Sequence, residues 1–177
     1  MLSIKQATLA SKNFLELTFI SIRRVTDHLF RRQPAAKMIA IDELTIDQVH
    51  DAFKSGAYTC RELVGAYIAR IKALDQQGPC LNAITVISSS CLDEANALDE
   101  HLKEHGSFIG PLHGVPVIVK DQCDTKDVPT AYGNICCVHT PTKDATLVKK
   151  LRDAGAVILA KSTMPGNGSE HHVMAFC

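Results

Sequence analysis

The sequence has no tryptophan, few aromatic residues and no surplus of charge of either sign. Its 19 Lys and Arg residues balance 19 Asp and Glu residues, so the chain carries no electrostatic sign of a nucleic-acid partner. It also has no apolar run long enough to cross a bilayer, which argues against a transmembrane segment. What is present, 177 residues of which 46% are hydrophobic, is the composition of an ordinary globular domain with room for a core.

The cysteines show no pattern of a disulfide framework or a metal-binding site. There are seven, an odd number, and none stands in a C-x-x-C arrangement. The sequence also shows no secretory signal with a small-residue cleavage site. We therefore expect free thiols in a reducing compartment, with the cytoplasm as the predicted location.

The first 37 residues differ from the rest. Their only acidic residues are Glu16 and Asp27, while Lys and Arg recur throughout, and an apolar patch covers 14–22. Two interpretations stay open for this basic extension: a targeting presequence, which would make the location mitochondrial, or a basic arm without a targeting role. Pro34 marks the boundary, so we predict a basic extension at 1–37 and a globular part from residue 38.

Three helices are predicted between the boundary and residue 106. Thr45 with Gln48, and Thr59 with Glu62, have the spacing of capping boxes, and Gly56 ends the first helix. Ser90 is expected to cap the third helix, which ends before glycine, and a short strand is predicted at 83–87. The buried faces predicted for the second and third helices contain Leu63, Ala66, Tyr67, Ile71 and Leu74, and Leu92, Ala95, Leu98 and Leu102.

A short run of β-branched residues at 115–119 predicts a buried strand, with Pro116 close to its first residue. The strand ends in Lys120 and Asp121, whose side chains alternate to opposite faces, so they need not pair with each other. Burial of Lys120 among Val and Ile would lower its pKa and let it accept a proton. The alternative is a strand-end lysine that reaches water.

A βαβ unit is predicted to follow. After a loop at 122–142, Asp144 is expected to cap a helix that runs to about residue 154, with Leu147, Val148 and Leu151 inward. An apolar strand at 156–160 then leads into Lys161, Ser162 and Thr163. The two strands should be parallel, so Lys120 and Lys161 should emerge at the same sheet end. The adjacency of the strands stays open, and the polar residues after 160 also suit an ordinary strand end.

The order of motifs in this region resembles the amidase signature family, and its fungal-type amidases in particular. The resemblance rests on Gly110-Pro111-Leu112-His113-Gly114-Val115-Pro116, Lys120-Asp121, Thr125-Lys126-Asp127, Pro129-Thr130, Asp144-Ala145, Lys149 through Lys161, and Met164-Pro165.

That resemblance implies an α/β fold, here a partial mixed or parallel sheet with flanking helices, which is the N-terminal portion of the family's larger sheet. It implies hydrolysis of carbon–nitrogen amide bonds in a small-molecule substrate, with no metal or organic cofactor. Lys120 matches the family's catalytic lysine, which deprotonates a bridging serine that in turn activates a nucleophilic serine.

The resemblance stops after Pro165. The family's segment with both serines would follow there, so we expect the domain part at 38–165, a non-family tail at 166–177, and a fragment that lacks both serines. The competing interpretation is a catalytically inactive truncated product or an interaction module. Because the chain supplies few strands, we also expect the strand at 156–160 to keep an unpaired neighbour position.

Other candidates for a site have weaker patterns. Ser169 lacks the following glycine of a nucleophile elbow, and His171, His172 and Cys177 lack the spacing of a zinc site. A Cys123–His139 pair has no local support, and no glycine-rich turn follows the first strand, as a nucleotide site would require.

Overall fold

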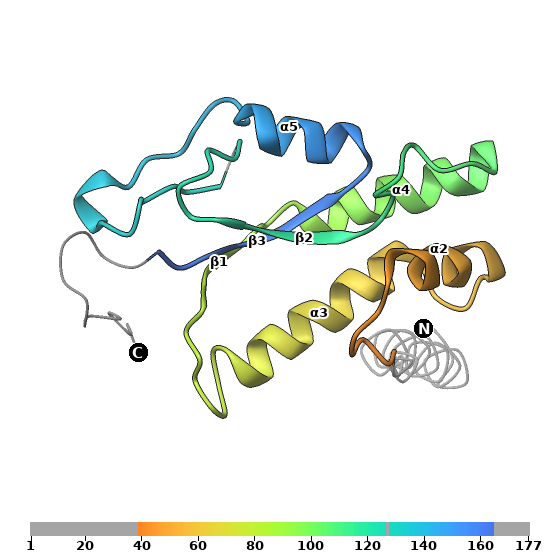
Figure 1. Cartoon of the computed structure of the whole chain (residues 1–177), viewed down its shortest axis with the longest axis horizontal. Coiled ribbons are helices and arrows are strands. Elements are labelled where there is room, and N and C mark those ends of the chain that lie inside the picture. Colours follow the sequence, from red (N-terminus) through yellow and green to blue (C-terminus); the bar gives the residue numbers. More distant parts are fainter. Residues whose placement is uncertain (1–38, 127, 165–177) are drawn as a thin grey trace, which may run out of the picture. The chain divides into compact units, whose positions relative to one another are not determined.

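The computed structural model describes residues 39–126 and 128–164 (Figure 1). The basic extension at 1–37, the tail at 166–177 and the four tail candidates Ser169, His171, His172 and Cys177 lie outside the described residues. Within them the elements are α2 (Ile46–Ser55), α3 (Cys60–Leu74), β1 (Ile84–Ile87), α4 (Cys91–His105), β2 (Pro116–Lys120), the 3₁₀ helix η1 (Ile135–Cys137), α5 (Thr146–Asp153) and β3 (Val157–Ser162). No helix among these residues is both long enough and apolar enough to cross a membrane.

Both predicted capping boxes are confirmed at the starts of α2 and α3. The hydroxyl of Thr45 accepts the Gln48 N–H at 3.3 Å, and the Gln48 side chain accepts the Thr45 N–H at 2.9 Å. Thr59 and Glu62 make the same reciprocal pair. Gly56 ends α2 with a φ of +68°, a left-handed conformation that glycine adopts without a Cβ clash. Local sequence therefore defines the limits of these helices.

The three strands form one mixed sheet in the order β1-β3-β2. β2 and β3 are parallel, as the βαβ prediction required, and the structure shows that they are also adjacent. β2 begins at Pro116. β1 pairs with the other side of β3 in antiparallel register. The expectation of an unpaired neighbour for the strand at 156–160 is wrong, because β3 lies between two strands. Among the described residues, the free edges belong to β1 and β2.

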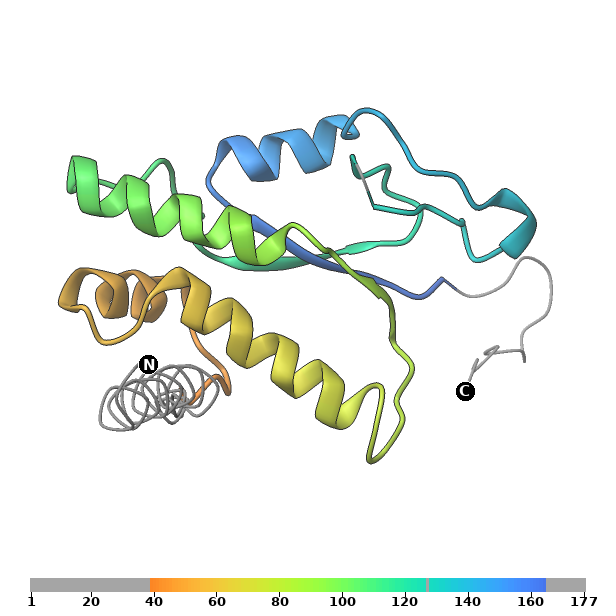
Figure 2. The same cartoon turned by 180° about the vertical axis from the view of Figure 1, so that it is seen from behind.

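Helices cover the sheet on two sides (Figures 1 and 2). On one side α2, α3 and α4 pack against Val157 and Leu159 of β3. On the other side Val148 of α5 packs against Val119 and Ile158. All residues from Val157 to Lys161 are buried, so β3 is the centre of the core.

Three local predictions fail, those for Leu74, Leu147 and Asp144, and one holds in part. Leu74 is 37% exposed because it ends α3 beyond the covered face, and Leu147 is 57% exposed because Val148 occupies the inward position. Asp144 does not cap α5, because its carboxylate accepts the Lys126 N–H and pairs with Arg152. Ser90 is the N-cap residue of α4, as predicted, but its hydroxyl donates to Glu94 and makes no cap hydrogen bond to a helix N–H.

The free edge of β2 predicts how this chain behaves in solution. Ile118 is 45% exposed on that edge, whereas the adjacent Val119 is 5% exposed in the core. An exposed apolar edge favours strand-to-strand association, and an edge lysine opposes it. We expect Ile118→Lys to reduce self-association in light scattering and to change the free energy of unfolding by no more than about 0.5 kcal/mol.

Val119→Lys is the matched control for this edge. It places an unpaired charge in the core and should cost several kcal/mol. An Ile118→Lys chain that self-associates as strongly as the wild type would contradict the assignment of this edge.

Candidate active site

Two lysines meet at the carboxyl ends of β2 and β3 in a reciprocal arrangement. Lys120 lies opposite Ser162 in the parallel register, and Lys161 lies opposite Val119. The Lys120 Nζ donates to the Thr163 carbonyl at 2.8 Å, and the Lys161 Nζ donates to the Asp121 carbonyl at 3.2 Å. Each lysine thus bonds to backbone just beyond the end of the other strand. The prediction that Lys120 and Lys161 emerge together is confirmed.

The surroundings of Lys120 decide between the two interpretations of this lysine. Its side chain is exposed, on the same face of β2 as the exposed Ile118, while Val119 between them is buried. Of the two interpretations of Lys120, the described residues therefore show the strand-end lysine that reaches water and not the one buried among Val and Ile. Asp121 does lie on the other face, where it is 2% exposed, as the alternation predicted.

Lys161 is the buried lysine of the pair, with an exposed fraction of 0%. Its ammonium donates to three neutral oxygens: the carbonyls of Asp121 at 3.2 Å and Pro129 at 3.1 Å, and the hydroxyl of Thr130. Burial lowers the pKa of Lys161, and the carboxylate charge of Asp121 acts in the opposite direction.

The burial of Lys161 was not among the expectations drawn from the sequence. A signal was available, since the unbroken apolar run before it suits a strand covered on both faces, and such a strand can bury its last residues as well.

The buried carboxylate of Asp121 organises the loop after β2. It accepts the Gly133 N–H at 3.0 Å and the Ala131 N–H at 3.4 Å. Thr130 and His139 exchange two backbone hydrogen bonds, at 2.8 and 3.0 Å, and form an isolated bridge. The region predicted as a loop without elements of its own thus contains η1 and internal bridges. Two buried charged side chains at the strand ends, Asp121 and Lys161, hold this loop in place through hydrogen bonds to its backbone.

His113 lies on the turn that leads into β2 and is fully buried. Its Nδ1 accepts the Ile109 N–H at 3.3 Å, and its ring stacks on Phe108 with centroids 4.8 Å apart. Burial lowers the pKa of His113, and the nearby His101 and His50 lower it further. A Cβ on Gly155, whose φ is +90°, would lie 2.8 Å from the His113 Cα. This close packing gives His113 a structural role under the strand that carries Lys120.

The alternative sites find no support within the described residues. No hydrogen bond joins Cys123 to His139 there, because the His139 Nδ1 is 3.1 Å from the Cys137 carbonyl and its Nε2 is 3.4 Å from Asp124. Across 39–126 and 128–164, no group of three or more His, Cys, Asp or Glu side chains could hold a metal ion.

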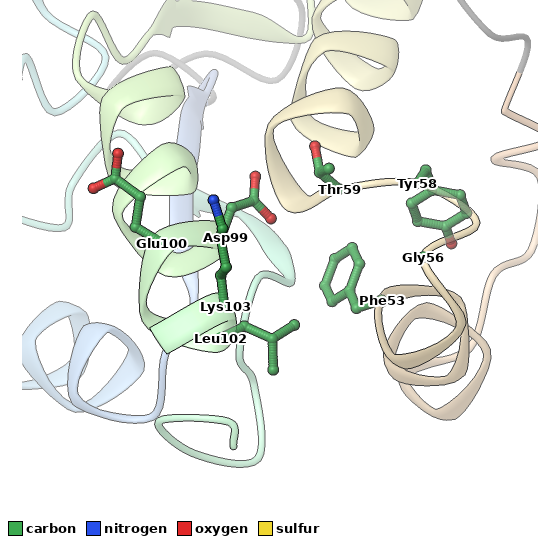
Figure 3. A pocket seen from close by; sticks show the side chains of 8 residues that line it. All are labelled: Phe53, Gly56, Tyr58, Thr59, Asp99, Glu100, Leu102 and Lys103. Atoms are coloured by element: carbon green, nitrogen blue, oxygen red, sulfur yellow. The ribbon is translucent and has the colours of Figure 1, made fainter. Parts of the chain in front are cut away.

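A hollow of about 370 Å³ opens elsewhere, between the start of α3 and α4 (Figure 3). The Asp99 carboxylate there accepts the N–H groups of Cys60 and Arg61 at 2.7 and 3.0 Å, so it caps α3. Neither Lys120 nor Lys161 lines this hollow, so it is separate from the strand-end site. Its lining consists of Phe53, Gly56, Tyr58, Thr59, Asp99, Glu100, Leu102 and Lys103.

Comparison with known proteins gives consistent matches. The chain matches the family described as Amidase over residues 62–172. It is 40% identical over 126 residues to one of the subunits of the glutamyl-tRNA(Gln) amidotransferase of Alkaliphilus metalliredigens, covering 70% of this chain and 25% of that protein. It is 34% identical over 128 residues to Amidase 2 of Gibberella moniliformis, covering 72% of this chain and 24% of that protein.

Solved structures resemble the chain in the same way. The peptide amidase of Stenotrophomonas maltophilia superposes with a TM-score of 0.67 at 34% identity, covering 70% of this chain and 25% of that one. A structure of a fatty acid amide hydrolase gives a TM-score of 0.64 at 26% identity and covers 78% and 24%. The chain therefore spans about a quarter of the length of these relatives.

The lowered pKa of Lys161 predicts how stability depends on pH. Between that folded-state pKa and the ordinary value of 10.5, the unfolded chain binds more protons than the folded chain. The contribution of Lys161 to the free energy of unfolding should therefore rise with pH across this window. In Lys161→Met the rise should be absent, so denaturant titrations from neutral to alkaline pH should give diverging curves for the two proteins.

Two features make this pH comparison specific. The raised pKa values of Tyr58 and Tyr67 act in the opposite direction, but they are present in both proteins and cancel in the difference. Thr85→Val is the matched control, because the Thr85 hydroxyl bonds to the Lys161 carbonyl and not to its ammonium. Parallel curves for wild type and Lys161→Met would rule out the lowered pKa of Lys161.

Proposed function

Because the chain belongs to the amidase family, we propose that it supplies the lysine base of a hydrolase that cleaves carbon–nitrogen amide bonds. The observation that carries the proposal is the position of Lys120, at the carboxyl end of β2 with its side chain exposed. Carboxyl ends of parallel strands are where α/β folds build their sites. This position also matches the lysine of the family's motif.

The chemistry follows the nucleophile-and-base logic of serine hydrolases. A neutral Lys120 would take a proton from a bridging serine, which takes one from the nucleophilic serine. The serine oxygen then attacks the amide carbon, the carbon–nitrogen bond breaks, and the amine leaves with a proton. Water completes the cycle by cleaving the acyl ester.

The described contacts leave Lys120 without an acidic partner. Its Nζ donates to the carbonyl of Thr163 at 2.8 Å, and no carboxylate among the described residues pairs with it.

Lys161 has a separate role in this proposal as a positioning residue. Its three hydrogen bonds join β3 to Asp121, Pro129 and Thr130, all within the segment that begins directly after Lys120. A displacement of about 1 Å of a catalytic group can cost on the order of 100-fold in rate. Lys161 would act on the reaction by limiting such displacement of Lys120.

The substrate class we propose is a small-molecule amide, turned over by a whole protein that contains both serines. The 177-residue sequence alone should be inactive, because a base without its nucleophile cannot form an acyl-enzyme. The free β2 edge with the exposed Ile118 favours a second candidate, a non-catalytic interaction module. Activity measurements separate the two.

The first arm of the test uses the 177-residue chain with a fluorophosphonate probe and a panel of aliphatic and aryl amides. We expect no serine labelling and no turnover. Stoichiometric labelling, or turnover that disappears in Lys120→Ala, would show that the chain is active by itself.

The second arm joins residues 1–165 to the remaining part of a fungal amidase. Lys120→Ala should lower kcat/KM by at least about 1,000-fold, because removing one member of a catalytic unit costs nearly as much as removing all. Lys161→Ala should weaken turnover less. A folded, active protein that is indifferent to Lys120→Ala would show that the base is another residue.

A further inference from the structure

The proposed reaction does not use two adjacent thiols, Cys136 and Cys137, which lie in η1. Both are free and exposed. The other free cysteines of the described residues are isolated in sequence: Cys60 and Cys91 are buried, Cys123 is partly buried and Cys80 is exposed. Within 39–126 and 128–164, η1 is thus where two accessible thiols occur side by side.

The backbone geometry determines which ligand this pair suits. Consecutive Cα atoms are about 3.8 Å apart, shorter than the range of roughly 4.4–6.8 Å that unstrained disulfides span. A direct disulfide between Cys136 and Cys137 would therefore be strained. A single large, soft atom between the two sulfurs relieves this constraint, because it separates them, and thiolates prefer soft partners.

The neighbours of the pair add an apolar component. Ile135 is 77% exposed and Val138 is 53% exposed, and the two residues flank the thiols on both sides. An organic group carried by the soft atom would find these side chains next to it. The ligand that suits all four residues is a soft, thiophilic centre with an apolar substituent.

We propose that Cys136 and Cys137 form a dithiol site that takes one trivalent arsenic centre carrying an apolar group. In the reaction with an arenearsenoxide, two As–S bonds form and the As–O bonds break. The two thiol protons leave with the oxygen as one water molecule. The oxidation state of arsenic does not change, so no oxidant or reductant takes part.

The position of η1 links this site to the strand-end lysines. Figures 1 and 2 show the loop with η1 at the end of the sheet where β3 finishes. The Cys137 N–H donates to the Asn134 carbonyl at 2.9 Å, and the Cys137 carbonyl lies 3.1 Å from the His139 Nδ1. His139 exchanges two backbone hydrogen bonds with Thr130, whose hydroxyl accepts from Lys161. Occupation of the thiols should therefore loosen the Thr130–His139 bridge.

The test begins with the reduced 177-residue chain and phenylarsine oxide. Intact mass and thiol titration should show one arsenical bound with the loss of two thiols, and digestion should place it on the peptide with Cys136 and Cys137. Excess dithiothreitol should remove it, whereas the same thiol concentration of a monothiol should not. An arsenical that maps to another cysteine would overturn the proposal.

Single serine variants provide the matched controls. Cys136→Ser and Cys137→Ser should each weaken binding by at least about 100-fold, because the second thiol then no longer adds an intramolecular contact. Both positions are exposed, so these changes should leave the melting temperature unaltered. Cys80→Ser removes an exposed isolated thiol and should bind like the wild type. Unchanged affinity in either pair variant would overturn the proposal.

The coupling to the lysines has its own readout. Hydrogen exchange of the Thr130 and His139 amides should become faster when the arsenical is bound, and it should stay at the wild-type rate in Cys137→Ser treated in the same way. If both amides exchange at the same rate in the free and the bound chain, the link from η1 to Thr130 is wrong. None of these measurements depends on amide hydrolysis.

Discussion

The buried ammonium of Lys161 is the interaction on which the strand-end site depends. A charge removed from water is costly unless hydrogen bonds replace its hydration, and here three oxygens from one loop do so. Because those oxygens belong to Asp121, Pro129 and Thr130, satisfying Lys161 requires the loop after β2 to fold back over the end of β3. The backbone that follows Lys120 is placed as a consequence.

The buried carboxylate of Asp121 holds the same loop from the end of β2. It accepts backbone N–H groups of Ala131 and Gly133, so one buried residue of each sign organises the same loop. His113 lies on the turn that leads into β2. Gly155 approaches it so closely that a Cβ on Gly155 would clash with the His113 backbone. Lys120 is thus exposed at the end of β2, whereas Lys161 is fully buried near the end of the neighbouring β3.

Much of this fold could be predicted from local sequence. The capping boxes at Thr45 and Thr59, the left-handed Gly56 and the proline at the start of β2 depend on neighbours in sequence, and the structure has them as expected. The parallel pairing of β2 and β3 followed from the crossover helix between them. The family motifs, read in order, gave the α/β class and its relationship to amidases.

The rest depended on contacts between distant residues. The exposure of Lys120 is decided by which helices cover β2, and the pattern of that strand does not contain this information. The apolar run before Lys161 suits burial of that lysine, but it does not say which oxygens of the distant loop bind its ammonium. The same reason explains Leu74 and Leu147, which have helical spacing but lie beyond the covered faces. The loop at 122–142 looked unstructured because the buried side chains of Asp121 and Lys161, which hydrogen-bond to its backbone, lie at the strand ends and not within the loop.

The most direct test of this account is the titration of individual lysines. In a chain labelled with ¹³C at the lysine Cε, NMR spectra recorded from neutral to alkaline pH should show a resonance that titrates below 10.5, and Lys161→Met should remove that resonance. A spectrum in which every lysine titrates at the ordinary value, or in which the early resonance persists in Lys161→Met, would contradict the central role of the buried lysine.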